Sequence, residues 1–251
     1  MAGIRNGIAA TRRLAPEACA ENIEVAGGLV AFTGIESPLS EAFGVGSLEP
    51  VSQEQVALIT SFYESRGTAP RVFVTPLSDP TLGRALADAG YAPVEYENVL
   101  ATDDLRTHGR HDARIGIARD LDAWAAASAR AFVEREALEP GEDLIARILA
   151  QSEGVLPLEA RDGGEIAATA AMDVCGEWSA CFAGSTLPPF RRRGWHEALV
   201  RDRIARAHEA GAQFMRATAR PASASERNFH RCGFRTLYTR ALWERKLGAR
   251  R

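Results

Sequence analysis

The segment of residues 184–199, GSTLPPFRRRGWHEAL, holds the densest group of residues suited to binding a ligand. A strand is expected to end just before its two prolines, which cannot continue the hydrogen-bonded ladder. The basic loop 191–194 then opens a helix. The first turn of a helix has backbone N–H groups without partners and a partial positive charge, so anions bind there. Three arginines followed by Gly194, which lets the backbone approach a ligand closely, predict a site for a pyrophosphate.

This loop differs from the two common phosphate-binding motifs. It is not a Walker A loop, because the lysine is missing, and it is not GxGxxG, because the second and third glycines are missing. An alternative interpretation is a basic helix cap on a solvated surface. The chemistry of the loop alone gives the two interpretations equal weight.

Strands and helices are predicted on both sides of this loop. Apolar residues recur at helical spacing in some segments and alternate in others. Asp162-Gly163-Gly164 and Gly176-Glu177 are turn signals between strands. The predicted strands are 114–117, 155–160, 166–174, 180–187, 214–219 and 234–247, and the predicted helices are 121–133, 142–149, 194–210 and 223–231.

The chain also contains an internal similarity. Residues 60–100 and 203–243 share the order helix, Gly, strand, Pro, short helix, Gly-aromatic, strand, with near-equal spacing of the glycines. A polar stretch at 102–112, which includes His108 and His111, is predicted to be a solvated linker between the copies. We therefore predict two related modules, at residues 1–105 and 113–251.

Two motifs in the second module resemble those of the GNAT family of acyl-CoA-dependent N-acyltransferases. The family signature is Arg/Gln-x-x-Gly-x-Gly/Ala between a strand and a long helix, and residues 191–196 read RRRGWH. Residues 228–234, NFHRCGF, are similar to the family's second landmark, a short helix that runs into Gly-Phe. The resemblance covers about residues 113–247. It implies an α/β (α+β) fold with a mixed, mostly antiparallel, splayed sheet flanked by helices.

The resemblance also implies where coenzyme A binds. The pantetheine arm would pair with the backbone of residues 184–186, in a gap between the strands 180–186 and 214–219. The pyrophosphate would bind the amides of residues 192–197. The coenzyme-binding residues implied in this way are Gly184, Ser185, Thr186, Arg191, Arg192, Arg193, Gly194, Trp195, His196, Glu197 and Asn228.

Three positions depart from the family pattern. His196 replaces the second glycine of the signature, where its ring would crowd or bind a phosphate, or turn toward solvent. Phe229 occupies the place of a tyrosine that serves many members as general acid, and Ala217 lies where a catalytic glutamate is expected. Neither of these two side chains transfers a proton, so both usual catalytic positions are empty.

Few residues are available to replace them. Ser225 is a candidate donor to the departing thiolate, with a helix cap as its alternative role. Tyr238 is a second candidate, with a half-buried strand aromatic as the alternative. Glu134 and Glu136 fall in a region that borders the acceptor site in the family, or in a solvated loop. A bound water working with backbone carbonyls is a further route for the amine proton.

The first module has no equivalent basic loop. The corresponding position falls at Pro50 in GVGSLEPVSQEQ, where nothing is basic. We therefore predict that residues 1–105 form a degenerate GNAT-like module without coenzyme binding, which frames the acceptor cleft, and that residues 113–251 form the acetyltransferase domain.

The resemblance implies an enzyme that moves an acetyl group from acetyl-CoA to a primary amine of a small molecule or peptide. One alternative is a non-catalytic acyl-CoA-binding regulatory module, which the empty catalytic positions favour. Another is an interaction protein that binds no coenzyme and carries the arginines as a plain surface patch. The sequence identifies neither the acceptor nor the oligomeric state.

Composition excludes several other classes. The net charge of −3 argues against nucleic-acid binding. No apolar run reaches the ~18 residues of a membrane span, and the N-terminus lacks the apolar region of a secretory signal, so we expect a cytoplasmic protein. The four cysteines and five histidines lack the spacing of metal ligands, so we expect no metal.

Overall fold

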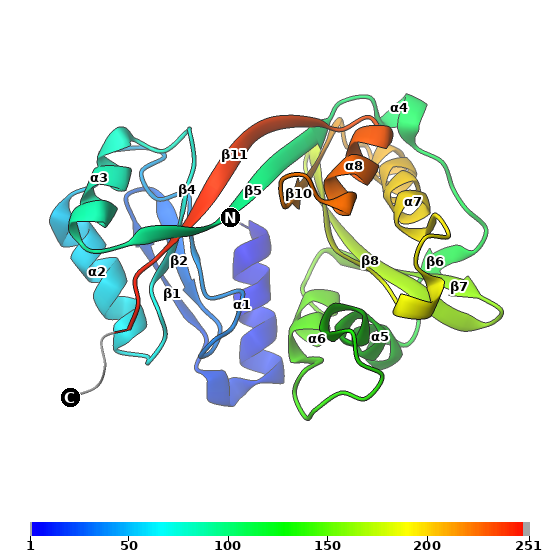
Figure 1. Cartoon of the computed structure of the whole chain (residues 1–251), viewed down its shortest axis with the longest axis horizontal. Helices are drawn as coiled ribbons and strands as arrows, with labels where there is room; N and C mark the ends of the chain where they lie inside the picture. The colour runs from blue at the N-terminus through cyan, green and yellow to red at the C-terminus, as the bar shows by residue number, and fades with distance from the viewer. Residues whose placement is uncertain (1, 248–251) are drawn as a thin grey trace. The chain divides into compact units, whose positions relative to one another are not determined.

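The computed structural model describes residues 2–247, and the chain divides into two compact units (Figure 1). The first comprises Met1–Glu97 and Tyr238–Arg251, and the second comprises Asn98–Leu237. These units do not follow the predicted module boundaries, since residues 98–105 belong to the second unit and residues 238–247 to the first. The last residues of the predicted second module, 248–251, lie outside the described part.

The first unit is a sheet with helices on both faces. Its elements are α1 (Ala2–Leu14), η1 (Pro16–Ala18), β1 (Glu21–Val25), β2 (Gly28–Phe32), β3 (Ala42–Phe43), α2 (Gln53–Glu64), β4 (Arg71–Val74) and α3 (Pro80–Asp88), with the start of β5 (Ala92–Thr102) and most of β11 (Arg235–Glu244). Val30 and Phe32 of β2 pack in the core formed with α2 and α3, and Ala31 packs with Ile8 of α1. Because alternate side chains of a strand point to opposite faces, β2 is buried on both.

The second unit contains the predicted loop. Its elements are the end of β5, α4 (Leu105–His108), β6 (Ile115–Ile117), α5 (Leu121–Val133), α6 (Leu144–Ala150), β7 (Val155–Asp162), β8 (Glu165–Cys175), β9 (Trp178–Thr186), η2 (Pro188–Phe190), α7 (Trp195–Glu209), β10 (Phe214–Ala219), α8 (Ala224–Arg231) and the start of β11. The strand order is β5-β10-β9-β8-β7-β6. Between the described residues of this unit, β9 and β10 pair in parallel and the other neighbouring strands pair antiparallel, so the predicted mixed, mostly antiparallel sheet is confirmed.

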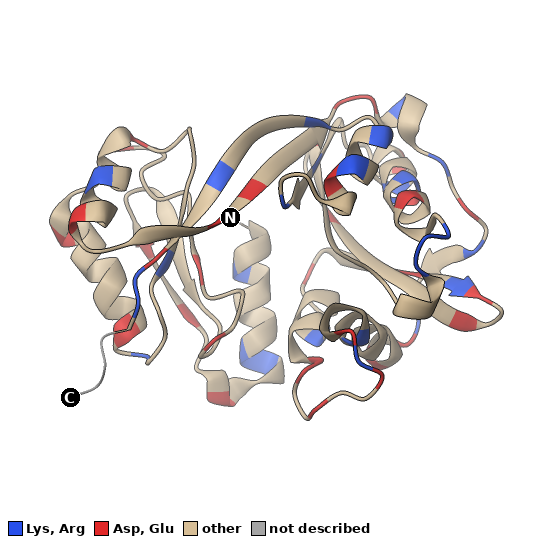
Figure 2. Ribbon diagram, viewed as in Figure 1, with Lys and Arg blue, Asp and Glu red and all other residues tan. Residues whose placement is uncertain are grey.

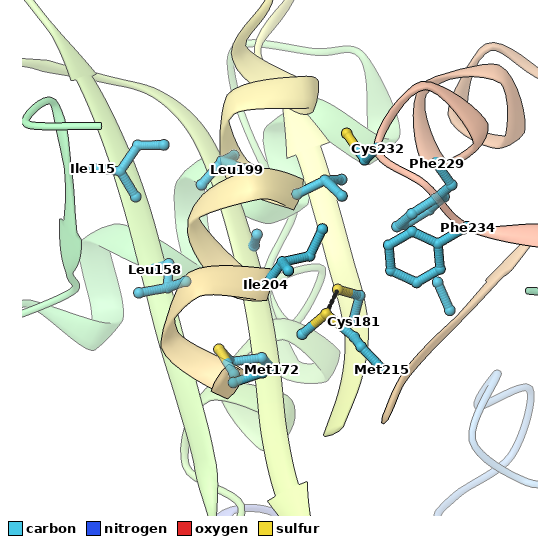
Figure 3. Packing of buried hydrophobic residues seen from close by; sticks show 14 of the residues in the cluster. Ile115, Leu158, Met172, Cys181, Leu199, Ile204, Met215, Phe229, Cys232 and Phe234 are labelled. Atoms are coloured by element: carbon cyan, nitrogen blue, oxygen red, sulfur yellow. Dashed lines mark hydrogen bonds between the residues drawn. The ribbon is translucent and has the colours of Figure 1, made fainter. Parts of the chain in front are cut away.

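Helices cover the two faces of this second sheet (Figure 1). Helix α7 packs on one face, where Leu199 and Ile204 lie in a common core with Leu158 and Met172 of β7 and β8 (Figure 3). Helices α5 and α6 pack on the other face, around Trp124. The buried indole donates to the carbonyl of Leu158 at 2.8 Å. This packing fixes the N-terminal end of α7 against the ends of the strands.

Two helices are among the elements that the sequence prediction missed, together with β1 and β3. Helix α1 was not predicted, and α4 lies inside the stretch 102–112 that was predicted to be a solvated linker. This stretch is attached to α7: the amide of Arg110 donates to the carbonyl of Arg201 at 3.0 Å, and His111 bonds two carboxylates of α7. Its polar side chains therefore have partners on a neighbouring helix, which a composition argument does not detect.

The two similar segments have the same order of elements, α2–β4–α3–β5 and α7–β10–α8–β11. The four glycines that marked the similarity, Gly67, Gly90, Gly211 and Gly233, all have positive φ, where glycine is favoured. In each segment the last strand ends in the other unit, since β5 pairs with β10 and β11 pairs with β4. Each sheet is thus completed by the final strand of the other segment.

Candidate functional site

Strands β9 and β10 separate halfway along their length. Their parallel pairing runs from Trp178 and Phe214 to Cys181 and Ala217, and then stops. The predicted gap between these strands is therefore present. Beyond Cys181, β9 keeps its pairing with β8 but has no β10 partner, so one backbone edge of β9 is open there.

A β-bulge lies at the point where the strands separate. The register between β8 and β9 shifts between Thr169 and Ala171, and Ala183 of β9 has a φ of 48°. An extra residue in one strand bends it and leaves a residue without a ladder partner. The bulge therefore turns β9 away from β10 and frees backbone groups next to the gap.

The N-terminus of α7 lies after the end of β9 and lacks a side-chain cap. Gly194 is the N-cap, with a φ of 82°, and no side chain accepts from the first-turn amides. Open space surrounds the position where a Cβ would stand on Gly194. The arginines of the preceding loop are visible as a blue stretch ahead of α7 (Figure 2). These uncapped amides and the basic loop lie together at the place where the sequence predicts an anion site, and the arrangement suits an anion.

A cavity of about 690 Å³ joins the edge of β9 to the starts of α7 and α8. Every predicted coenzyme-binding residue except Arg193 lines this cavity: Gly184, Ser185, Thr186, Arg191, Arg192, Gly194, Trp195, His196, Glu197 and Asn228. Arg193 instead contacts Asp162 at 3.1 Å and lies over the ring of Phe190.

The candidate catalytic residues are placed differently. Ser225 and Glu134 line the cavity, and Tyr238 and Glu136 do not. Tyr238 is a partly buried residue of β11 and belongs to the first unit, and Glu136 is exposed. Ser223 is the N-cap of α8 and accepts from the amide of Glu226 at 3.1 Å. The helix-cap alternative for Ser225 is therefore wrong, and its hydroxyl is not used for capping.

Five lining residues were not predicted: Ala131, Phe132, Phe190, Ala224 and Arg231. Phe132 lies in the last turn of α5 with 64% of its surface exposed. An apolar side chain that interrupts the polar face of its helix is the signal that would have marked it. No pattern in the sequence distinguishes Arg231 from the other arginines of the chain.

Arg191 connects the basic loop to the end of α5. Its guanidinium donates to the carbonyls of Thr186 and Ala131, and it pairs with Glu134 at 2.9 Å. Arg192 has a φ of 62° and makes no ion pair within residues 2–247. Its charge is therefore available to a bound anion, whereas that of Arg191 already has a carboxylate partner.

The ring of His196 points toward α8 and not toward solvent. Its Nε2 lies 3.4 Å from Ser225 Oγ, its Nδ1 lies 3.2 Å from Asn228 Nδ2, and its plane meets the ring of Phe229 edge-on. Burial, and secondarily the charge of Arg203, lower the pKa of His196 to about 4. The imidazole is therefore neutral at physiological pH.

Hydrogen bonds fix which nitrogen of His196 carries its proton. Arg231 donates to Asn228 Oδ1 at 2.7 Å, which directs the amide Nδ2 toward the ring. Because Nδ2 is a donor, it requires an unprotonated Nδ1, and the proton of the neutral ring is on Nε2. Nε2 then donates to Ser225 Oγ, so the hydroxyl hydrogen of Ser225 is not used in this bond.

The two usual catalytic positions contain no proton-transfer group. Phe229 and Ala217 are 4% and 3% exposed and belong to the core under α7 and α8 (Figure 3 labels Phe229). The remaining carboxylates of the cavity have partners, since Glu134 pairs with Arg191 and Glu197 accepts from Arg201 at 3.0 Å. Neither carboxylate is therefore free, and both ring nitrogens of His196 already have hydrogen-bond partners, so Ser225 is the candidate that remains of those predicted from the sequence.

Residues 2–247 contain no cluster of three or more His, Cys, Asp or Glu side chains arranged to hold a metal ion. None of their helices combines the length and the apolar composition that crossing a membrane requires.

Comparison with known proteins identifies the family of one part of the chain. Residues 119–234 match the family model described as "Acetyltransferase (GNAT) family". No curated protein sequence matches the chain significantly.

Solved structures resemble almost the whole chain. A GCN5-related N-acetyltransferase from Kribbella flavida is 16% identical with a TM-score of 0.67, and the match covers 98% of this chain and 96% of that one. A tandem GNAT protein from the clavulanic acid biosynthesis pathway is 12% identical with a TM-score of 0.63, over 98% and 89%. An acetyltransferase of the GNAT family from Colwellia psychrerythraea is 14% identical with a TM-score of 0.57, over 92% and 87%.

At these identities the structural likeness establishes the fold, and the family model identifies a GNAT domain at residues 119–234. The matched residues include the basic loop, the start of α7 and all of α8. Residues 119–234 of this chain therefore belong to the acetyltransferase (GNAT) family, within a fold similar to that of tandem GNAT proteins.

Proposed function

We propose that the protein is an N-acetyltransferase that moves an acetyl group from acetyl-CoA to a primary amine of a small molecule or peptide. Family and fold point to acyl transfer from an acyl-CoA donor. The observation that carries the proposal is the cavity in which the open edge of β9, the uncapped start of α7 and Ser225 of α8 meet.

The residues of the cavity suit the parts of the donor. Residues 184–186 present an open backbone edge to the amides of the pantetheine arm. The first-turn amides of α7 and the unpaired Arg192 suit the pyrophosphate, because charge-assisted hydrogen bonds to phosphate are strong. When bound, the donor supplies an activated acyl group as a thioester.

Ser225 is the group we assign to the departing sulfur. Its hydroxyl lines the cavity, and the bonds that link Arg231, Asn228 and His196 make Ser225 Oγ an acceptor from His196, so its own hydrogen is not used in that bond. No carboxylate or imidazole is free to act as general base, which is usually worth about 10²–10⁴-fold in rate. The acceptor therefore has to react as the free amine, and positioning of the two reactants supplies the remaining rate enhancement.

The first test is titration of the full chain with acetyl-CoA, followed by thiol release with a panel of primary amines. We expect a thermal shift with acetyl-CoA and release with at least one amine. No shift at millimolar acetyl-CoA would remove the proposal.

The second test identifies the side chain that donates a hydrogen bond to the departing sulfur. Ser225→Ala should lower kcat by about tenfold with unchanged coenzyme affinity, which corresponds to ~1.4 kcal/mol in the barrier. Tyr238→Phe is the matched removal of a hydroxyl, and it should leave kcat within about twofold, or ~0.4 kcal/mol. A Ser225→Ala enzyme with parental turnover shows that Ser225 is not the donor.

A second candidate function is a non-catalytic acyl-CoA-binding regulatory module. Buried Phe229 and Ala217 at the usual catalytic positions favour it. It predicts coenzyme binding in calorimetry with no thiol release across the whole amine panel, whereas the enzyme predicts both.

A further inference from the structure

Arg203 of α7 is a buried cation without a carboxylate partner. It is 1% exposed, and its guanidinium lies between α7 and the β8–β9 pair. Nε donates to the carbonyl of Leu199, and Nη1 donates to the carbonyls of Ala171 and Phe182, at 3.0, 3.1 and 3.3 Å. Within the described part of the chain, no Asp or Glu lies within ion-pair distance of it. A buried charge is normally paired, so an unneutralised one calls for a role.

The free end of this guanidinium lies beside the cavity wall. A Cβ placed on Gly184 would stand 3.7 Å from Arg203 Nη2 and 3.7 Å from His196 Nε2. Gly184 and His196 both line the cavity, and Gly184 follows the bulge residue Ala183. Because Gly184 has no side chain, no Cβ lies between Nη2 and the backbone of β9 next to the bulge.

The other groups around Arg203 do not cancel its charge. Burial raises the pKa of the Cys181 thiol on β9, and burial together with Arg203 lowers the pKa of His196 on α7, so both are neutral near pH 7. Ser225 faces His196 from α8 and carries no charge. Asp173 of β8 accepts from the amide of Ala180 at 3.0 Å and makes no ion pair with Arg203. The guanidinium therefore imposes a positive potential on this end of the cavity, where low dielectric strengthens it.

We propose that Arg203 is the fixed positive charge of the acyl-transfer site, acting through the wall at Gly184 to stabilise negative charge on the coenzyme sulfur. This inference rests on the proposed function. In the reaction the amine lone pair forms the C–N bond, the C–S bonding pair leaves on sulfur, and the extra amine proton passes to water. Arg203 does not contact the reactants. It is a positioning residue whose positive charge stabilises the thiolate form of the coenzyme sulfur relative to the thiol.

The test compares coenzyme A with desulfo-coenzyme A, which lacks the thiol, on the full chain by calorimetry. We expect the ratio of the two affinities to rise about fivefold or more between about pH 6 and pH 9, as for a bound thiol whose pKa is lowered by about one unit. Arg203→Met should make the ratio independent of pH. Arg203→Lys keeps the charge and should keep the rise. Desulfo-coenzyme A should bind all three proteins with similar affinity, which shows that the cavity is intact.

A second readout is the pKa of His196, followed by NMR titration. It should move upward in Arg203→Met and stay near the parental value in Arg203→Lys, and a purely structural role for the guanidinium predicts the same change in both variants. If Arg203→Met fails to bind desulfo-coenzyme A, the pH dependence of the affinity ratio in the parent and in Arg203→Lys tests the inference. A pH-independent ratio in the parent, or loss of the rise in a folded Arg203→Lys, overturns the inference.

The outcomes also separate this inference from the proposed function. Binding of coenzyme A and desulfo-coenzyme A with a constant ratio would refute the role of Arg203 and leave acyl transfer standing. Failure of the parent to bind either ligand would refute the proposed function, and the inference with it.

Discussion

Helices α2 and α7 occupy the same place in the two similar segments, but their N-termini are built in opposite ways. Helix α2 begins with a capping box, in which Ser52 Oγ accepts from the Gln55 amide and Gln55 Oε1 accepts from the Ser52 amide, at 3.2 and 2.9 Å. Helix α7 begins at Gly194 with no side-chain cap, after three arginines. The first unit thus satisfies its helix N-terminus internally, and the second leaves its own open.

A helix at this place in the segment is therefore not sufficient for a ligand site. A capping box occupies the amides that an anion needs, and Glu54 in the first turn of α2 would repel a phosphate. An uncapped helix loses the stability of a cap, worth about 1 kcal/mol, and a bound anion can restore it. We therefore propose that only the second unit binds coenzyme.

The largest effect is expected at the glycine that opens α7. Gly194→Val should weaken coenzyme binding at least about tenfold, or ~1.4 kcal/mol, because a β-branched side chain obstructs backbone approach to the pyrophosphate. Gly211→Val is the matched control, because Gly211 ends the same helix with a φ of 85° and equally open space. Both variants should lose similar stability, and only the first should lose affinity in calorimetry. Equal affinities would place the coenzyme elsewhere.

Adjacent arginines should differ in their contribution to binding. Arg192→Ala should raise the coenzyme Kd about three- to tenfold, because Arg192 lines the cavity without an ion-pair partner. Arg193→Ala removes the same charge from a residue that pairs with Asp162, and should change Kd by less than about twofold. If both substitutions have the same effect, the loop attracts coenzyme through its total charge and not through a specific contact.

Removal of the N-terminal cap of α2 should lower the stability of the protein and leave its affinity for coenzyme unchanged. Ser52→Ala removes the capping box of α2 and should lower the free energy of unfolding by about 1 kcal/mol, measured by denaturant titration. Coenzyme affinity should not change. A loss of affinity in Ser52→Ala would contradict the assignment of coenzyme binding to the second unit alone.

The smallest effect concerns His111, which ties residues 109–112 to α7. Hydrogen bonds to Glu209 and then to Asp202 raise the pKa of His111 above its ordinary value. A raised folded-state pKa contributes stability below the unfolded pKa of about 6.5, and this is lost as pH rises through the folded value. The difference in melting temperature between the parent and His111→Gln should therefore shrink from acidic to alkaline pH. A difference that grows with pH would contradict the assignment.

Local patterns were enough to predict most elements of the second unit. Helix α5 and strand β10 have the predicted bounds, because helical apolar spacing and flanking turn residues act within a few residues of chain. The basic loop and Gly194 were also predicted, since the anion site depends on consecutive residues. Helix α1 and α4 were missed: α1 buries only a few side chains against β2, and α4 is a single turn held by α7.

Sequence motifs and their family resemblance were enough to predict the basic loop at the start of α7, the fold class and the lack of a proton-transfer group at Phe229 and Ala217. Only the tertiary structure decided which residues meet around that loop. His196, Ser225, Asn228 and Arg231 form one hydrogen-bonded chain because α7 and α8 pack together. Arg203 reads as an ordinary arginine in the sequence, and it becomes a buried unpaired charge because its helix face turns toward the bulged strand. Such properties depend on distances between segments, and no local pattern of residues encodes them.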